Sequence, residues 1–368
     1  MQALLGIIFH SLGGAASGSW YMPYNLVKKW RWEIYWIIGG LFSWLIVPYI
    51  AVVLTAPGWQ EIIGATDFSV LRLTYILGVL WGIGGLTYGL GIRYLGMSLG
   101  NSVLLGITSV VGSLGLPLLR NVGSLSEVLP AGDSFTDMLS TASGRLVLFG
   151  IVVLMVGIVL CGKAGLMKDK DIVEIKDDNS VNSEFNLTKG LVIAGISGVL
   201  SAFFNFGIDA GKEMGEAVRE MAVANDFAFV SNGTYLFENN IIFLVILWGG
   251  LTTNLIWSLY LIFRNKSAGD LVDKSAPLFK NYLFCALAGT TWFLQFFFYG
   301  MGETKIGNGA SSWILHMSTI ILTANFWGFY RKEWAGVSKK TRTTIYLGIG
   351  LILLSVIIMG IAKADFMN

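Results

Sequence analysis

Charged residues are scarce in this sequence. Asp, Glu, Lys and Arg make up only 13% of its 368 residues, whereas an average soluble domain carries about 25%. There are also only 6 prolines, 2 cysteines and 2 histidines. The shortage of charge excludes an ordinary soluble domain. The cysteines, Cys161 and Cys285, lie in different apolar segments and predict neither a disulfide nor a metal pair.

Several motifs that carry enzymatic chemistry are also missing. The sequence has no glycine-rich phosphate loop, no His-Glu-x-x-His pair and no nucleotide-binding domain. We therefore expect a protein that is not an enzyme, with no cofactor, no metal and no nucleic-acid partner. An integral membrane enzyme is a second alternative, although the centres of the apolar segments lack a Ser–Lys dyad, a His–acid pair and metal-ligand spacing. The sequence does not predict an oligomeric state.

Apolar residues are abundant, at 54%, and ten of the runs they form are about 20 residues long. Such a run crosses a hydrocarbon core of about 30 Å as a helix, and a single segment in lipid must satisfy its own backbone hydrogen bonds. The sequence therefore predicts an all-α integral membrane protein with ten transmembrane helices. The predicted spans cover residues 2–22, 34–56, 72–92, 97–118, 145–162, 190–210, 241–263, 281–301, 310–330 and 344–362.

The basic residues predict how these helices are oriented. Of the 25 lysines and arginines, 18 fall in the connections that follow spans 1, 3, 5, 7 and 9. Basic loops stay in the cytoplasm, so both termini are predicted to be periplasmic. Because five spans are an odd number, the two halves run in opposite directions. Residues 1–163 and 190–368 are therefore predicted to form two inverted five-helix repeats, joined by a cytoplasmic linker at 164–189.

Two stretches share one pattern. Trp81–Gly91 reads WGIGGLTYGLG and Trp292–Gly302 reads WFLQFFFYGMG. Residues at i, i+3 and i+7 share a helix face, so Trp292, Gln295 and Tyr299 form one stripe. The repeated pattern predicts a duplicated unit whose two copies face one shared site. The matching stripe of the first stretch is Trp81, Gly84 and Tyr88.

Three further spans add polar groups to this predicted site. Polar side chains inside a membrane cost free energy and are functional candidates by default. Faces of the first, sixth and ninth spans carry hydroxyl, amide, indole and imidazole groups, with no cluster of fixed charge. A neutral sugar fits such a site best, because its apolar face packs on a ring while its hydroxyls need several partners. The predicted substrate-binding residues are His10, Ser17, Tyr21, Trp81, Gly84, Tyr88, Asn205, Trp292, Gln295, Tyr299, Trp313 and His316.

Strings along nearly the whole chain resemble one family. They are Phe9-His10, Gly14-Ala15-Ala16-Ser17, Lys28-Lys29-Trp30, Trp32-Glu33, Trp81-Gly82-Ile83-Gly84, Tyr88-Gly89-Leu90, Arg93–Ser98, Glu184–Leu187, Leu294–Tyr299, Leu315–Ser318 and Lys332-Glu333-Trp334. In this order they resemble the bacterial L-rhamnose–proton symporters of the drug/metabolite transporter superfamily. The resemblance implies uptake of L-rhamnose, or a closely related 6-deoxy sugar, with protons by alternating access across the bacterial inner membrane. It also implies ten helices in two inverted repeats.

The resemblance further implies a residue that carries the coupled proton. His10 is predicted first, because it lies on a glycine-rich helix in the site and imidazole titrates near neutral pH. Asp209 comes second and Glu33 third, since each carboxylate needs burial to titrate in that range. A salt bridge that anchors a helix end is the competing role for Glu33. Asp209 and the long acidic loop at 119–144 depart from the family pattern.

A rival function with the same fold is export of amino acids, drugs or other metabolites. A cytoplasmic site for an amino acid or a nucleotide sugar is expected to contain buried Lys or Arg. The centres of the predicted spans have neither residue. The sequence therefore favours import of a neutral sugar over this alternative.

Overall fold

The computed structural model describes residues 2–95, 97–123, 129, 132–176, 186–332 and 334–362. Within these ranges the chain is helical except for loops and one antiparallel hairpin of β1 (Val230–Ser231) and β2 (Thr234–Tyr235). The long helices are α1 (Gln2–Ser19), α5 (Phe68–Leu95), α6 (Met97–Leu119), α9 (Ala142–Lys176), α10 (Leu187–Ala210), α12 (Asn240–Asn265), α13 (Leu278–Ile306), α14 (Gly309–Tyr330) and α15 (Lys339–Ala362). A further continuous run consists of α2 (Trp32–Leu41), the π turn η2 (Phe42–Ile46) and α3 (Val47–Thr55). The short elements are η1 (Pro23–Leu26), α4 (Trp59–Ala65), α8 (Phe135–Ser140), α11 (Lys212–Ala224) and η3 (Ala268–Leu271).

The long helices make this a membrane protein, as the apolar runs predicted. Within the described residues, 7 helical segments are long and apolar enough to cross a bilayer. They are Trp32–Thr55, Phe68–Leu95, Ala142–Lys168, Thr188–Ala210, Asn240–Asn265, Leu278–Ile306 and Lys339–Ala362. The other three predicted spans lie in α1, α6 and α14, which pack among these segments. Large apolar side chains on the outer faces, such as Val159 and Phe263, are exposed, as a surface in contact with lipid requires.

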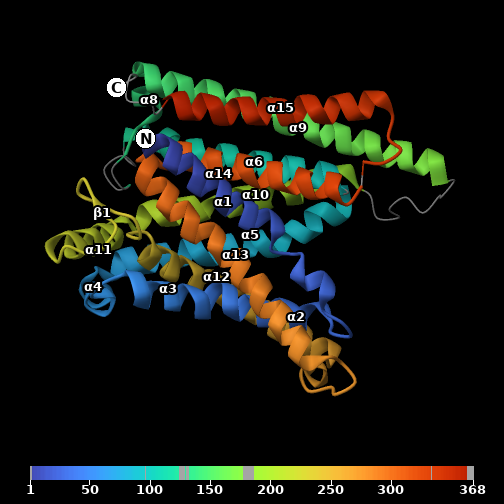
Figure 1. Cartoon of the computed structure of the whole chain (residues 1–368), viewed down its shortest axis with the longest axis horizontal. Helices are drawn as coiled ribbons and strands as arrows, with labels where there is room; N and C mark the ends of the chain where they lie inside the picture. Colours follow the sequence, from blue (N-terminus) through green and yellow to red (C-terminus); the bar gives the residue numbers. More distant parts are fainter. Residues whose placement is uncertain are drawn as a thin grey trace.

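The helices pack as crossing pairs (Figure 1). Helix α1 lies against α13 and α14, and α10 lies against α5 and α6. Helix α12 packs on α5 and on the α2–η2–α3 run, while α9 and α15 lie side by side along one edge, at the top of Figure 1. The largest buried apolar cluster joins α10, α12 and α13 to the α2–η2–α3 run.

Glycine sets two of these crossings. A β-carbon on Gly13 of α1 would lie 2.8 Å from the Gln295 carbonyl oxygen of α13, and one on Gly84 of α5 would lie 2.8 Å from the Ser201 nitrogen of α10. At Gly84 the carbonyl oxygen also accepts a 2.7 Å hydrogen bond from Ser197. Both backbones therefore approach too closely for any larger residue, as small residues at membrane helix crossings allow.

The two ends of the bundle differ. The amino end of α1 and the carboxyl end of α15 lie near α8, α11 and the hairpin, at the left of Figure 1, and we call this the terminal end. The opposite end carries the connections at 27–31 and 266–277 and residues 331–332 and 334–338, and we call it the basic end. There Arg31 Nε lies 3.7 Å from the Asp270 carboxylate, which ties two of these connections together.

The predicted linker is partly helical. Helix α9 continues to Lys176, and residues 177–185 lie outside the described ranges. On this extension Asp171 accepts hydrogen bonds from the Ser338 amide (2.8 Å) and the Thr341 hydroxyl (2.6 Å), at the first turn of α15. These bonds hold the pKa of the Asp171 carboxyl below its usual value, and the carboxylate caps the amino end of a helix that belongs to the other half of the chain.

We expect Asp171→Ala to lower the midpoint of thermal unfolding at neutral pH. A depressed carboxyl pKa contributes stability above the unfolded value of 3.8, and that contribution disappears as pH falls through the folded value. The difference from the native chain should therefore shrink below about pH 4. Thermal unfolding of detergent-solubilised protein measures it, with Glu220→Ala on exposed α11 as the control. Equal midpoints for Asp171→Ala and the native chain at pH 7 would contradict this capping role.

Candidate functional site

A cavity of about 390 Å³ is lined by residues of α1, the α2–η2–α3 run, α5, α6, α10, α12, α13 and α14. Its volume falls within the range of about 300–1,000 Å³ that is usual for small-molecule sites. Because Trp20, Tyr24 and Ala324 also line it, the cavity extends toward the basic end. We call it the aromatic cavity, and its defining residues are Trp36, Trp44, Trp81, Trp292, Gln295 and His316.

Indole rings form most of one wall. The ring centroids of Trp81 and Trp292 are 5.7 Å apart, and Trp44 meets Trp292 edge-on at 6.0 Å. Trp44 lies on the π turn η2, and such turns often mark functional positions in helices. The wall therefore offers flat, electron-rich faces to which the C–H groups of a ligand can pack.

Hydrogen-bonding groups lie among these rings. The Gln295 amide nitrogen donates to the Trp292 carbonyl oxygen at 2.9 Å, so the amide has a fixed orientation, and among the described residues its side-chain oxygen accepts no hydrogen bond. Trp36 Nε1 donates to the Asn254 side-chain oxygen at 3.1 Å. The indole nitrogen of Trp44 is buried and has no partner within the described ranges. The cavity thus combines ring faces with donors and acceptors that are free for a ligand.

A layer of polar and aromatic side chains closes the end of this cavity. The Tyr299 ring is 5.2 Å from the rings of both His10 and His316 and 6.1 Å from Trp313, and its hydroxyl donates to the Asn205 side-chain oxygen at 3.2 Å. Asn205 in turn donates to the Gly112 carbonyl oxygen of α6 at 2.7 Å. We call these five side chains the central layer. Its members are His10, Asn205, Tyr299, Trp313 and His316.

The two imidazoles of the central layer lack hydrogen-bond partners. His10 and His316 are 0% and 1% exposed, and within the described residues neither ring has a partner for either nitrogen. A buried polar group without a partner costs about 1–3 kcal/mol, so such groups in a native structure need an explanation, of which a functional role is one. His316 also lines the aromatic cavity.

A second cavity lies beyond the central layer, toward the terminal end. It has a volume of about 360 Å³, and Asn205 lines it from the layer side. In contrast to the aromatic cavity, it is rich in charged groups, and we call it the charged cavity. Its defining residues are Arg120, Asp209, Lys212, Arg219, Glu238 and Glu303.

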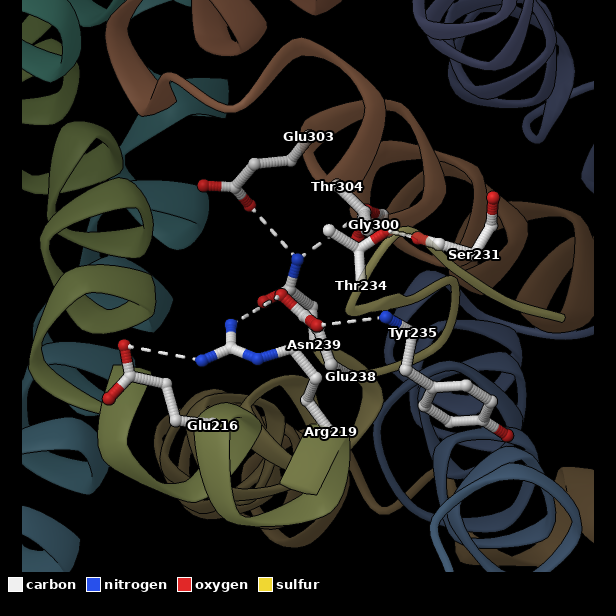
Figure 2. A network of polar contacts seen from close by, with 10 residues as sticks. All are labelled: Glu216, Arg219, Ser231, Thr234, Tyr235, Glu238, Asn239, Gly300, Glu303 and Thr304. Carbon is white, nitrogen blue, oxygen red and sulfur yellow. Dashed lines mark hydrogen bonds and ion pairs between the residues drawn. The ribbon is translucent and has the colours of Figure 1, made fainter. Parts of the chain in front are cut away.

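Three of the carboxylates in the charged cavity, those of Asp209, Glu216 and Glu238, have a basic partner. Arg120 Nη2 lies 3.2 Å from Asp209, and Arg219 Nη1 lies 3.5 Å from Glu238 (Figure 2). Glu238 precedes the α12 span, and burial raises the pKa of its carboxyl although Arg219 opposes that shift. The sequence analysis did not predict this second, charged cavity.

Comparison with known proteins decides the family. The family model described as L-rhamnose-proton symport protein matches residues 1–365. The chain belongs to the L-rhamnose-proton symport protein family. Relatives named L-rhamnose-proton symporter, from Yersinia pestis (strain Pestoides F) and Yersinia pseudotuberculosis (serotype O:1b, strain IP 31758), are each 35% identical to this chain over 366 residues. The match covers 98% of this chain and 98% of each relative.

The structure brings ten of the predicted substrate-binding residues to the aromatic cavity or the central layer of this family member. The other two lie elsewhere: Tyr21 is 42% exposed and its hydroxyl meets Tyr35, and Gly84 is at the crossing of α5 with α10. Of these ten predicted residues, the seven that line the aromatic cavity are Ser17, Trp81, Tyr88, Trp292, Gln295, Trp313 and His316. The residues of the central layer that do not line that cavity are His10, Asn205 and Tyr299.

The predicted proton-coupling residues are far apart. His10 is in the central layer, whereas Asp209 lines the charged cavity and pairs with Arg120. Glu33 is 4% exposed and accepts a 2.9 Å hydrogen bond from Asn265 at the basic end. This hydrogen bond joins the ends of α2 and α12. Its donor is a neutral amide, whereas the competing role predicted for Glu33 was a salt bridge.

The sequence analysis did not predict two groups of residues that line the cavities of this protein. Trp36, Trp44 and Asn254 line the aromatic cavity, but in the sequence they are single polar or aromatic residues in apolar helices. Glu303 had a signal, because it continues the face of Tyr299 by one turn, at i+4. The predicted eighth span ended at residue 301, whereas α13 runs to Ile306. Glu303 was therefore not considered as a residue of that span.

Proposed function

We propose that this protein imports L-rhamnose together with protons across a bacterial inner membrane. Family membership supports this proposal, and the names of the relatives state it for those proteins. The observation that carries it is the pair of unpartnered nitrogens on His316, beside the indole rings of the aromatic cavity. A neutral sugar supplies hydroxyls for the imidazole and C–H groups for the rings.

The sugar would pack against the wall formed by the Trp81 and Trp292 rings, in our proposal. The contact between these two rings supports this position, as does the Gln295 amide, whose side-chain oxygen is free to accept from a hydroxyl. Among the described residues that line the aromatic cavity there is no Asp, Glu, Lys or Arg. A charged substrate would lack a counter-charge there, so a neutral ligand is favoured.

We infer that the chain consists of two inverted five-helix halves that form ten transmembrane helices. The packing supports this, because α1 contacts α13 and α14 as α10 contacts α5 and α6. The shared pattern pairs Trp81 with Trp292, whose rings meet, and Gly84 with Gln295. Gly84 lies where α5 crosses α10, and Gln295 lies where α13 crosses α1. These matched crossings support halves at 1–163 and 190–368.

We further propose that the basic end faces the cytoplasm and that both termini are periplasmic. The concentration of Lys and Arg in alternate connections supports this orientation. The aromatic cavity would then communicate with the cytoplasm, and the central layer would separate it from the periplasmic charged cavity. Transport requires an alternate state in which the layer opens and the basic end closes.

The coupled proton would bind near the central layer in this proposal. Of the residues predicted from sequence, His10 is favoured by its position between the two cavities. Asp209 already has Arg120 as its counter-charge, and Glu33 lies at the far end of the aromatic cavity's helices. Neither carboxylate contacts the layer in the described structure.

We expect proteoliposomes that contain the purified protein to accumulate radiolabelled L-rhamnose when the outside is more acidic than the inside. The inward proton gradient supplies the free energy for uphill sugar movement. Collapsing the gradient with a protonophore should leave only equilibration. Equal uptake with and without the gradient would contradict proton coupling, and absence of both uptake and exchange would contradict rhamnose as the substrate.

We expect Gln295→Ala to weaken L-rhamnose binding at least several-fold. Losing one hydrogen bond between a buried group and a ligand costs about 1–3 kcal/mol. Calorimetric titration of the folded, detergent-solubilised variant measures the affinity, and Gln60→Ala on exposed α4 is the matched control. Unchanged affinity in a variant that unfolds at the native temperature would remove Gln295 from the site.

A further inference from the structure

Among the carboxylates of the charged cavity that are not exposed, Glu303 is the one with which no described basic group pairs. Asp209 has Arg120 at 3.2 Å and Glu238 has Arg219 at 3.5 Å. Glu303 instead accepts a single 3.2 Å hydrogen bond from the Asn239 side chain, a neutral amide, as Figure 2 shows. Within the described ranges Glu303 forms no ion pair, so a proton is the counter-charge left to it.

A neighbouring carboxylate, that of Asp209, strengthens that argument. The position that a β-carbon would take on Gly309 lies 3.6 Å from Glu303 Oε1 and 3.9 Å from Asp209 Oδ1, so the two carboxylates flank the same point. Like charges this close disfavour double ionisation. Because Arg120 stabilises the ionised form of Asp209, the shared negative charge resides there, and Glu303 is the member that binds a proton.

Glu303 also lies next to the central layer. It follows Tyr299 by one helical turn on α13 and therefore shares its face. A β-carbon on the preceding residue, Gly302, would be 2.7 Å from His10 Nε2, so the unpartnered imidazole rests directly on the backbone beside Glu303. His10 lines neither cavity, whereas Glu303 lines the charged cavity and meets the solvent there.

We propose that Glu303 takes up the coupled proton from the charged cavity. This inference rests on the proposed function. A proton passes from cavity water to a Glu303 carboxylate oxygen in the outward-open state, which leaves a neutral acid, and it is released to water on the cytoplasmic side after the layer has closed and the basic end has opened. The charged or titratable groups that face Glu303 or line its cavity from the neighbouring elements are His10, Arg120, Asp133, Asp209, Lys212, Glu216, Arg219 and Glu238.

The test compares Glu303→Gln with the native chain in proteoliposomes. Glutamine resembles the neutral acid, so exchange of labelled for unlabelled L-rhamnose across the membrane should continue, while accumulation driven by an acidic exterior should be lost. In native protein the sugar affinity should rise as external pH falls, because linked sites typically change each other's affinity by about 5–150-fold. In Glu303→Gln that change should fall below about twofold.

Glu216→Gln is the matched control, since Glu216 lines the same cavity but its side chain is 45% exposed and lies 3.9 Å from Arg219. It should accumulate rhamnose as the native chain does. Accumulation by Glu303→Gln would overturn the proposal, as would loss of accumulation in Glu216→Gln to the same degree. If Glu303→Gln does not fold, Glu303→Asp replaces it: a shifted pH midpoint of uptake supports the proposal, and an unshifted one overturns it.

The proposed function fails separately from this inference. If native protein exchanges rhamnose but never accumulates it against a pH gradient, proton coupling itself is wrong. If native protein accumulates rhamnose and Glu303→Gln does so equally, only the assignment of Glu303 is wrong.

Discussion

The main physical constraint on this structure is the energetic cost of buried hydrogen-bonding groups that have no partner within the described residues. Within the described residues, both imidazoles of the central layer lack partners, as do the hydroxyls of Ser311, Ser312 and Ser318 on the same helix as His316. Each such group costs about 1–3 kcal/mol in an apolar interior. A core that needed only to be stable would replace them with apolar side chains. Their presence between two cavities fits a site that is completed by a polar ligand and by protons.

Helix α6 holds the central layer in place. Its backbone oxygens accept hydrogen bonds from two layer residues, Asn205 to Gly112 and Trp313 to Thr108 at 3.1 Å. Tyr299 then bonds to Asn205, so three of the five side chains are linked to one helix backbone. Any opening between the cavities must break these bonds or move α6 with the layer.

Local chemistry explains how much the sequence could predict. The stripe of Trp292, Gln295 and Tyr299 follows from helical spacing, and its copy placed Trp81 correctly against Trp292. The same spacing put Gly84 in the site, but a glycine in a repeated pattern can also mark a helix crossing, and here it does. Periodicity shows which residues share a face, and only tertiary packing decides what that face meets.

The charged cavity could not be predicted from single segments. Its ion pairs join residues distant in sequence, such as Arg120 with Asp209, and each charge taken alone resembles an ordinary helix end near a membrane surface. Helical spacing could have predicted Glu303, because it follows Tyr299 at i+4, but the predicted apolar span ended at residue 301 and left it out. The fold class therefore followed from composition, whereas the second cavity depended on how seven separate elements come together at the terminal end.

The most direct test of the account is whether the two cavities open to opposite sides of the membrane. Ala310 lines the charged cavity and Ala324 the aromatic cavity, 14 residues or about 21 Å apart on α14. In a chain with Cys161 and Cys285 replaced by alanine, a membrane-impermeant thiol reagent should label Ala310→Cys only from the periplasm. Without sugar, it should label Ala324→Cys only from the cytoplasm. Labelling of both positions from the same side would contradict a central layer that divides one transport path.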